Sequence, residues 1–255
     1  MKIEIAKLLQ RAGKCLGCAT VLASSVLLLG ADRGAPIRSF ESPVDVRLTA
    51  DPESSFWKST PGVMANHDNL GAPVEKNVME VRSRWTKANL YVLFICDYDT
   101  VHLKPGGDPQ HETFGLWDWD VAEIFIGDDF TNINRYKEFE VSPRGEWVDL
   151  DIDSKKMGGD SNAWRWNSNF KVKARIDEAK KFWYAEMCIP FASISHEQPR
   201  LNQHFRANFY RAAGQEPNRL LRTWRPTHAP TFHVPASFGI LQLSALNEHA
   251  SSPYE

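Results

Sequence analysis

The chain has 255 residues, of which 42% are hydrophobic and 24% charged, and its formal net charge is −2. A chain of this length and composition can bury one sizeable hydrophobic core. Four basic residues and one acidic residue within positions 1–31 leave a charge of −5 for the remainder. With no basic stripe in that acidic remainder, the sequence excludes the usual electrostatic footprint of a nucleic-acid-binding protein.

Residues 1–31 combine a basic start with an apolar run from Cys15 to Ala31, a pattern typical of a signal peptide. The run is short for a membrane span, and it is apolar on every face, which disfavours a buried amphipathic helix. We therefore expect a secreted or periplasmic protein, held at the membrane if this N-terminal anchor stays uncleaved. Residues 32–43 are polar and contain proline, which predicts a linker, and residues 245–255 are expected to be a C-terminal tail.

Beyond the linker, short stretches with period-two alternation predict strands. Val44, Val46 and Leu48 indicate a first strand, and residues 60–77, rich in Pro, Gly and Asn, indicate a loop. A hairpin follows, with strands at 79–85 and 90–96 and a turn at 87–89. Further strands are expected at 121–127, 136–142, 146–152, 170–176, 182–189, 205–212, 220–224 and 239–244. About ten strands without a helix longer than a turn or two predict one all-β domain at 44–244, an antiparallel β-sandwich of jelly-roll type.

The stretch Gly115–Gly127 joins an aromatic, acidic loop to one of these strands. Tryptophan is costly to expose, so Trp117 and Trp119 in a polar loop suggest a binding surface. Alternation places the strand residues on two faces: Ala122, Ile124 and Ile126 on one, and Val121, Glu123 and Phe125 on the other.

Six motifs recur in a recognisable order: Leu90–Phe94, Trp117–Ile126, Glu138–Pro143, Trp183–Pro190, Ala207–Phe209 and Phe232–Gly239. This order resembles the family 9 carbohydrate-binding modules, which are β-sandwich sugar binders often attached to xylan-degrading enzymes. The resemblance runs from about Val44 to Ser244. It implies a non-catalytic saccharide-binding domain that supports polysaccharide breakdown, with a separately encoded glycoside hydrolase as a candidate partner.

The resemblance also implies a site, in which a sugar lies in a slot between Trp117 and Phe232. Phe232 stands where better-known members carry Trp, and Glu140 stands where they carry an Arg that hydrogen-bonds the sugar. Phe232 keeps an aromatic face on which a sugar can stack. Glu140 lacks the guanidinium group, which can donate two hydrogen bonds to neighbouring hydroxyls. Glu123 and Asn208 match the motif positions of that family.

The residue chemistry points in the same direction without the family. A pyranose has an apolar face of C–H groups and a rim of hydroxyls, so sugar sites pair aromatic planes with polar side chains. The residues with that chemistry are Trp117, Trp119, Trp224 and Phe232, with Asp118, Asp120 and Arg225. For Trp85, Trp147 and Trp183, which sit in alternating strands, packing in the core is the expected role.

Other functions remain open from the sequence. A glycoside hydrolase needs two carboxylates across a cleft at about 5 to 9 Å, and the candidates are Asp118, Asp120, Glu123, Glu138 and Glu140. A haem-binding sandwich would use Met64, Met79 or Met187 with His102 or His233. Calcium is a candidate ligand of the oxygen-rich positions Asp128, Asp129, Asn132, Asn134, Asp149, Asp151 and Asp153, for which a solvated acidic face is the simpler interpretation. Cys96 and Cys188 are expected to be buried thiols, with a disulfide as the alternative.

Overall fold

The computed structural model describes residues 34–156 and 161–245, so the predicted signal segment lies outside the described residues. The described chain is nearly all β-structure. Its α-helix, α1 (Phe191–Ile194), is a single turn, and no helix in these ranges is long and apolar enough to cross a membrane. The strands are β1 (Ile37–Glu41), β2 (Gly62–Ala65), β3 (His67–Asp68), β4 (Met79–Trp85), β5 (Asn89–Asp97), β6 (Val121–Gly127), β7 (Arg135–Val141), β8 (Trp147–Asp153), β9 (Lys171–Asp177), β10 (Phe182–Pro190), β11 (His204–Ala213), β12 (Leu220–Thr223) and β13 (Gly239–Ser244). Four 3-10 turns complete the list: η1 (Leu116–Asp118), η2 (Ser154–Lys156), η3 (Ser161–Trp164) and η4 (Pro235–Ser237).

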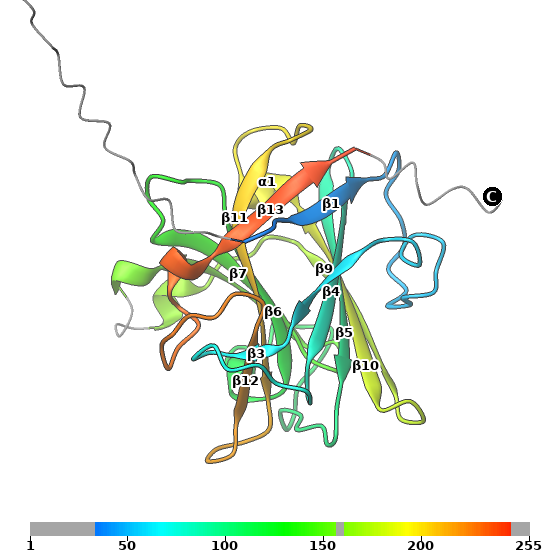
Figure 1. The fold of residues 1–255 in the computed structure, drawn as a ribbon, viewed down its shortest axis with the longest axis vertical. Helices are drawn as coiled ribbons and strands as arrows, with labels where there is room; N and C mark the ends of the chain where they lie inside the picture. The colour runs from blue at the N-terminus through cyan, green and yellow to red at the C-terminus, as the bar shows by residue number, and fades with distance from the viewer. Residues whose placement is uncertain (1–33, 157–160, 246–255) are drawn as a thin grey trace, which may run out of the picture. The chain divides into compact units, whose positions relative to one another are not determined.

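One hydrogen-bonded path runs through the sheet in the order β8-β7-β6-β11-β13-β1-β4-β5-β10-β9. The path folds over on itself, so that β7, β6 and β11 form one layer and β4, β5, β10 and β9 the other (Figure 1). The main hydrophobic core joins side chains of both layers, and the rings of Phe94 and Phe209 meet there with centroids 6.5 Å apart. The predicted β-sandwich is therefore consistent with the structure.

The sheet is mixed, and the prediction of a purely antiparallel sandwich was wrong in this respect. β1 pairs in parallel with β13, where Ile37 lies opposite Leu241, and in parallel with β4, where Glu41 lies opposite Trp85. The other strand pairs of the described residues are antiparallel. This strand comes from the segment predicted to be a linker at 32–43, so the folded sheet begins earlier in the chain than residue 44.

Two further expectations at the N-terminal end also need correction. Val44, Val46 and Leu48 do not form a strand. Instead, Val46 and Leu48 pack with Trp57 against Tyr91 and neighbouring side chains on the outer face of the sheet. The apolar residues alternate with polar ones here because one side of the segment covers the sheet. Residues 60–77, expected as a loop, contain β2 and β3. β2 adds an antiparallel partner to β4 and β3 pairs with β12.

Strand alternation holds closely where the sequence predicted it. In β6, Ala122, Ile124 and Ile126 lie in the main core, whereas Val121 and Phe125 belong to a second apolar cluster on the opposite face. Trp85 and Trp183 are buried in the main core and Trp147 packs against it, which confirms the packing role expected for these three. The β7–β8 turn at 142–145 is closed by a hydrogen bond from Gly145 N to Ser142 O, with Gly145 at a φ of 91°.

The two described cysteines are free. Cys96 lies in the main core, whereas Cys188 packs with the cluster on the outer face of the same layer. Their neighbours across the strands are different too, because Cys96 lies opposite Trp183 and Cys188 lies opposite Tyr91. The expectation of buried free thiols is confirmed for Cys96, whereas Cys188 is free but only partly buried, and the disulfide alternative was wrong.

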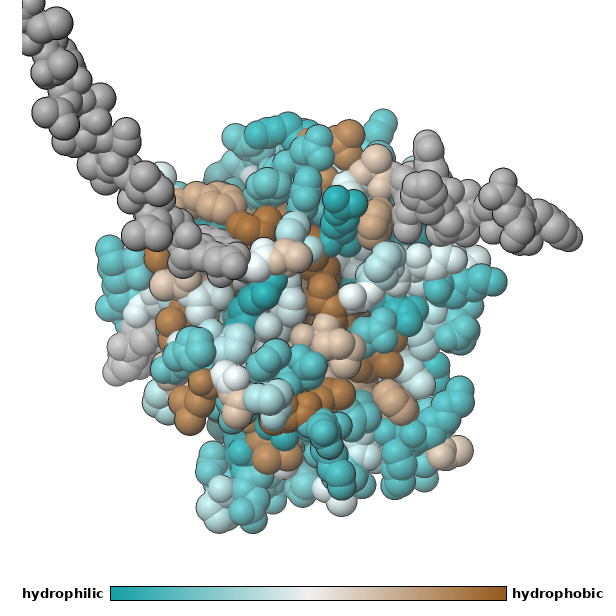
Figure 2. All heavy atoms as spheres, viewed as in Figure 1, coloured by the Kyte–Doolittle hydropathy of each residue, from teal (hydrophilic) through white to brown (hydrophobic). Residues whose placement is uncertain are grey.

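On the face shown in Figure 2, hydrophobic residues are interspersed among hydrophilic ones. The large apolar side chains that are exposed come from separate segments of the chain: Val44, Met64, Leu70, Phe130 and Leu201. Scattered apolar side chains of this kind are normal on a protein surface, so they do not by themselves indicate a binding site.

Candidate functional site

A cavity of about 500 Å³ opens on the face of β6, β7 and β8 that turns away from the main core. Side chains from these strands form its floor, η1 and η3 contribute to its wall, and residues 216–221 and 231–233 close the remaining side. The second apolar cluster, which includes Phe125 and Tyr210, packs beneath it. The cavity is therefore assembled from segments that are far apart in the sequence.

Two of the predicted aromatic residues line this cavity. Trp117, in η1, is partly exposed and meets Phe114 edge to face, with ring centroids 4.8 Å apart. Phe232 is stacked on Tyr210 at 4.2 Å and an interplanar angle of 16°, and 9% of its surface is exposed. One face of Phe232 is thus held by Tyr210, which fixes the ring beside the cavity.

Three glutamates share the face of the sheet beneath the cavity. Glu123 on β6 lies opposite Glu140 on β7, and Glu138 lies two residues earlier on β7, opposite Phe125. Since alternate residues of a strand point to the same side, all three carboxyl groups lie on the cavity side of the sheet. Glu123 and Glu138 line the cavity, and each of the three is at most 3% exposed.

The surroundings of these carboxyl groups favour their protonated forms. Burial and then repulsion from Glu138 raise the pKa of Glu123 well above its ordinary value, while the guanidinium of Arg219 opposes that shift. Burial and then repulsion from Glu123 and Glu138 likewise raise the pKa of Glu140. Burial raises the pKa of Glu138 as well, and His233 opposes it. Burial disfavours a charge, and like charges on neighbouring strands disfavour it further.

Two basic residues on the cavity wall, Arg219 and His233, were not predicted to bind the ligand. Arg219 lies 4.0 Å from Asp118 through its Nη1, and its buried Nε has no hydrogen-bond partner among the described residues. His233 hydrogen-bonds through Nδ1 with the hydroxyl of Tyr136 at 2.7 Å. Arg219 places a guanidinium on the cavity wall, whereas the resemblance to the family implied that Glu140 stands in place of such a group. Arg219 had no signal in the sequence, because it belongs to a polar loop without a motif. The sequence did mark His233, although as a haem ligand.

The other predicted site residues lie elsewhere. Glu140 is fully buried beneath the cavity and does not line it. Asn208 is also fully buried, where its side chain donates hydrogen bonds to Tyr210 Oη and Arg225 O, both at 2.8 Å, and so ties β11 to the chain after β12. Trp119 is partly buried and is not part of the cavity lining.

Trp224 belongs to the main core and packs on Phe209 at 5.6 Å. Gly239 lies directly against this indole, since a Cβ atom at Gly239 would come within 2.6 Å of the ring. Among the acids named with the site, Asp120 is buried and accepts hydrogen bonds from the backbone N–H groups of His102 and Gly214. These contacts give Trp224 and Asp120 structural roles.

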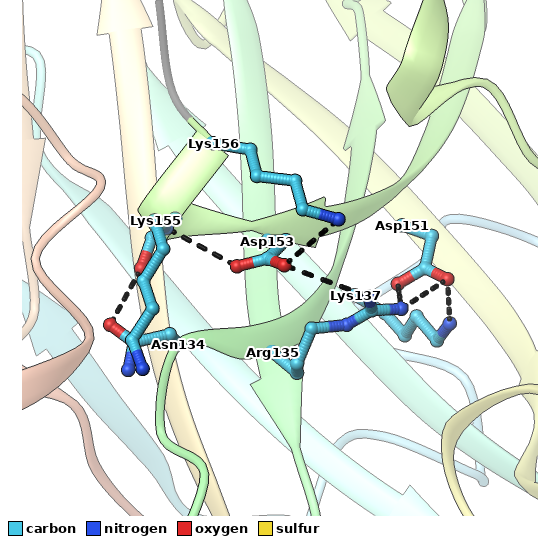
Figure 3. A network of polar contacts seen from close by, with 8 residues as sticks. Asn134, Arg135, Lys137, Asp151, Asp153, Lys155 and Lys156 are labelled. Atoms are coloured by element: carbon cyan, nitrogen blue, oxygen red, sulfur yellow. Dashed lines mark hydrogen bonds and ion pairs between the residues drawn. The ribbon is translucent and has the colours of Figure 1, made fainter.

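Three of the acidic positions considered for calcium, Asp129, Asp151 and Asp153, are engaged by neighbouring residues. Asp151 contacts Arg135 and Lys137 at 3.1 and 3.0 Å, and Asp153 lies 3.5 Å from Lys156 (Figure 3). The Asp129 carboxylate accepts hydrogen bonds from its own loop, including the backbone N–H of residue 131. Over residues 34–156 and 161–245, no group of three or more His, Cys, Asp or Glu side chains is arranged to hold a metal ion.

The residues considered for haem are not brought together around His233. Met79 and Met187 are fully buried in the main core, Met64 is exposed on β2, and the cavity lined by His233 contains no methionine. The carboxylates considered for hydrolysis are partly clustered, since Glu123, Glu138 and Glu140 lie on the adjacent strands β6 and β7.

The fold and this cavity define a β-sandwich with a concave aromatic and acidic site. Residues 53–246 match the family model described as carbohydrate family 9 binding domain-like, and the chain belongs to this family. No curated protein sequence matches the chain significantly.

Solved structures share the fold. A family 9 carbohydrate-binding module from Caldicellulosiruptor kristjanssonii in complex with cellotriose is 14% identical, with a TM-score of 0.57, and the match covers 86% of this chain and 99% of that one. A family 9 module from the same organism in complex with glucose is 14% identical, with a TM-score of 0.58, and the match covers 83% of this chain and 97% of that one. A putative carbohydrate-binding protein from Bacteroides uniformis gives 0.62 at 14% identity, with 82% and 99% covered.

Proposed function

We propose that this domain binds a saccharide without cleaving it, in the cavity between Trp117 and Phe232. The observation that carries the proposal is that one cavity combines the aromatic rings of Trp117 and Phe232 with the buried carboxyl groups of Glu123 and Glu138 and the guanidinium of Arg219. The rings would stack on the C–H face of a sugar, the carboxylates would accept hydrogen bonds from its hydroxyls, and the guanidinium would donate to them. Membership of the family and the sugar complexes of its structural neighbours support this assignment.

A binding role is favoured over hydrolysis by the placement of the acids. Glycosidases place two carboxyl groups on opposite sides of the scissile bond, whereas Glu123 and Glu138 come from neighbouring strands on the floor of the cavity. We further propose that the domain is exported and assists a separately encoded glycoside hydrolase in polysaccharide breakdown. Incubation with oligosaccharides should therefore leave their chain length unchanged, and the appearance of shorter products in chromatography would contradict the non-catalytic assignment.

Replacing Trp117 tests the site. Trp117→Ala should weaken binding of soluble oligosaccharides roughly tenfold or more, because the stacking contact and its buried area are lost. Isothermal titration calorimetry measures this loss, and circular dichroism checks that the variant remains folded. Trp119→Ala is the matched control, because the same residue type two positions further along does not line the cavity. Equal affinity of Trp117→Ala and the wild type would show that this cavity is not the site.

A further inference from the structure

The floor of the cavity has few hydrogen-bond donors for its carboxyl oxygens. Glu138 lines the cavity and is 3% exposed, and its Oε2 has no donor among the described residues apart from the neighbouring carboxyl group of Glu140 when that group holds a proton. Glu140 is buried beneath the cavity, and neither of its oxygens has another partner among the described residues. A buried acceptor without a donor is unfavourable, so the floor of the cavity is suited to a ligand that brings donors.

Acidic side chains also outnumber basic ones around the cavity. Glu123 and Glu138 lie on the floor, Glu140 is buried beneath it, and Glu216 lies on the wall. Arg219 lies 4.0 Å from Asp118, and its charge also opposes the rise in the pKa of Glu123 and Glu140. His233 Nδ1 is 3.9 Å from Glu138 Oε2, beyond hydrogen-bond distance, and is already bonded to Tyr136. The cavity is therefore acidic in its deepest part.

We propose that the saccharide held here is an amino sugar, whose free ammonium group binds at Glu123 and Glu138. This inference rests on the proposed saccharide-binding function and specifies the ligand class. An ammonium group has three donors and one positive charge. The donors would satisfy the carboxyl oxygens, and the positive charge would favour the ionised form that burial and mutual repulsion otherwise disfavour.

Other ligand classes fit less well. A neutral sugar brings hydroxyl donors but no positive charge to stabilise the ionised glutamates, and a uronic acid would add a negative charge beside them. A metal ion is disfavoured, because the glutamates are not arranged as metal ligands in the described part of the chain. Hydrogen bonds that involve a charged donor and acceptor are roughly twice as strong as neutral ones, which gives an ammonium group the advantage over a hydroxyl at this position.

The experiment compares three oligosaccharides of equal length by calorimetry near neutral pH: a deacetylated glucosamine oligomer, its N-acetylated form and a glucose oligomer. The deacetylated oligomer should bind the wild-type protein on the order of tenfold more tightly than either neutral one. Glu138→Gln should remove most of this preference by weakening binding of the deacetylated oligomer more than binding of the neutral ones, because the amide is close in shape and carries no charge. Glu178→Gln, at an exposed position in the β9–β10 turn, is the matched control and should leave the preference unchanged.

The outcomes separate the two proposals. If the neutral oligomers bind as tightly as the deacetylated one, or more tightly, the amino-sugar inference is wrong and the saccharide-binding function stands. If none of the three binds, the proposed function itself is unsupported. If a linear polyamine binds as tightly as the deacetylated oligomer, the cavity selects a cation without a sugar, and the inference is likewise overturned.

Discussion

The carboxyl group of Glu140 has no exposed surface, and neither of its oxygens accepts a hydrogen bond from a described residue. Glu123 and Glu138 repel its negative charge, and Arg219 opposes this effect. Because the folded state raises the pKa of this group, the folded protein binds a proton more tightly than the unfolded chain does. The ionised form of Glu140 therefore destabilises the fold.

The sign of the pH dependence follows from this raised pKa. Below the unfolded pKa of about 4.3 both states hold the proton, and the stability contribution is fully present. It is lost as the pH rises through the folded pKa. We expect Glu140→Gln to be more stable than the wild type at pH 7, because the amide is similar in shape and never carries the buried negative charge. Thermal unfolding at pH 4 and pH 7 measures this, and a variant less stable than the wild type at pH 7 would show that Glu140 is a favourable contact.

The site illustrates which residues can be predicted from sequence. Trp117 and Glu123 could be found because an aromatic loop leads directly into an alternating strand, and both line the cavity. Phe232 was found through the order of motifs. Arg219 could not be found, since its place on the cavity wall depends on how the β11–β12 loop folds back over the sheet. Asn208 matched a motif but proved to be a buried bridge between strands, because a motif does not reveal which polar groups are already satisfied.

At the scale of elements, period-two alternation located the central strands well and failed where packing replaced pairing. β6 and β10 are nearly continuous apolar runs, because each has two buried faces with different neighbours. The segment 44–48 alternates, but it lies over the sheet instead of in it. β1 was missed because it is short, contains Arg38 and Glu41, and is paired by strands distant in sequence.

The segment that covers the outer face is fastened to β10 by one buried carboxylate. Glu186 Oε2 accepts hydrogen bonds from the backbone N–H groups of Thr49 and Ala50 at 2.7 and 2.8 Å. Its Oε1 accepts one from Trp57 Nε1 at 2.9 Å. All three donors are thereby satisfied by a single side chain, in a segment that has no strand of its own between β1 and β2.

Glu186→Gln should therefore reduce the free energy of unfolding by about 1 to 3 kcal/mol, because an amide nitrogen cannot accept these hydrogen bonds and leaves donors unsatisfied. Urea denaturation followed by tryptophan fluorescence measures the change, since Trp57 is fully buried at this contact. The exposed Glu178→Gln variant serves as the control and should differ from the wild type by no more than about 0.5 kcal/mol. An unchanged midpoint for Glu186→Gln would mean that this anchoring contributes little.

At the scale of the whole molecule, β1 is the strand that joins the two halves of the hydrogen-bonded path. On one side β13 leads to β11 and β6, and on the other β4 leads to β5 and β10. Ile37 and Ser39 of β1 are at most 1% exposed, and the hydroxyl of Ser83 on β4 donates a hydrogen bond to that of Ser39 at 2.8 Å. The family match begins at residue 53, so a chain cut at that boundary would lack this strand.

We expect a chain that begins at residue 34 to fold, and one that begins at residue 44 to lose its cooperative unfolding transition or to aggregate. Removal of β1 leaves the facing edges of β13 and β4 without hydrogen-bond partners and uncovers apolar surface of the core. Differential scanning calorimetry together with size-exclusion chromatography distinguishes the two chains, and both lack the same residues before position 34. If the chain that begins at residue 44 unfolds at the same temperature as the longer one and stays monodisperse, β1 is an accessory strand, and the two layers are held together by side-chain packing such as that between Phe94 and Phe209.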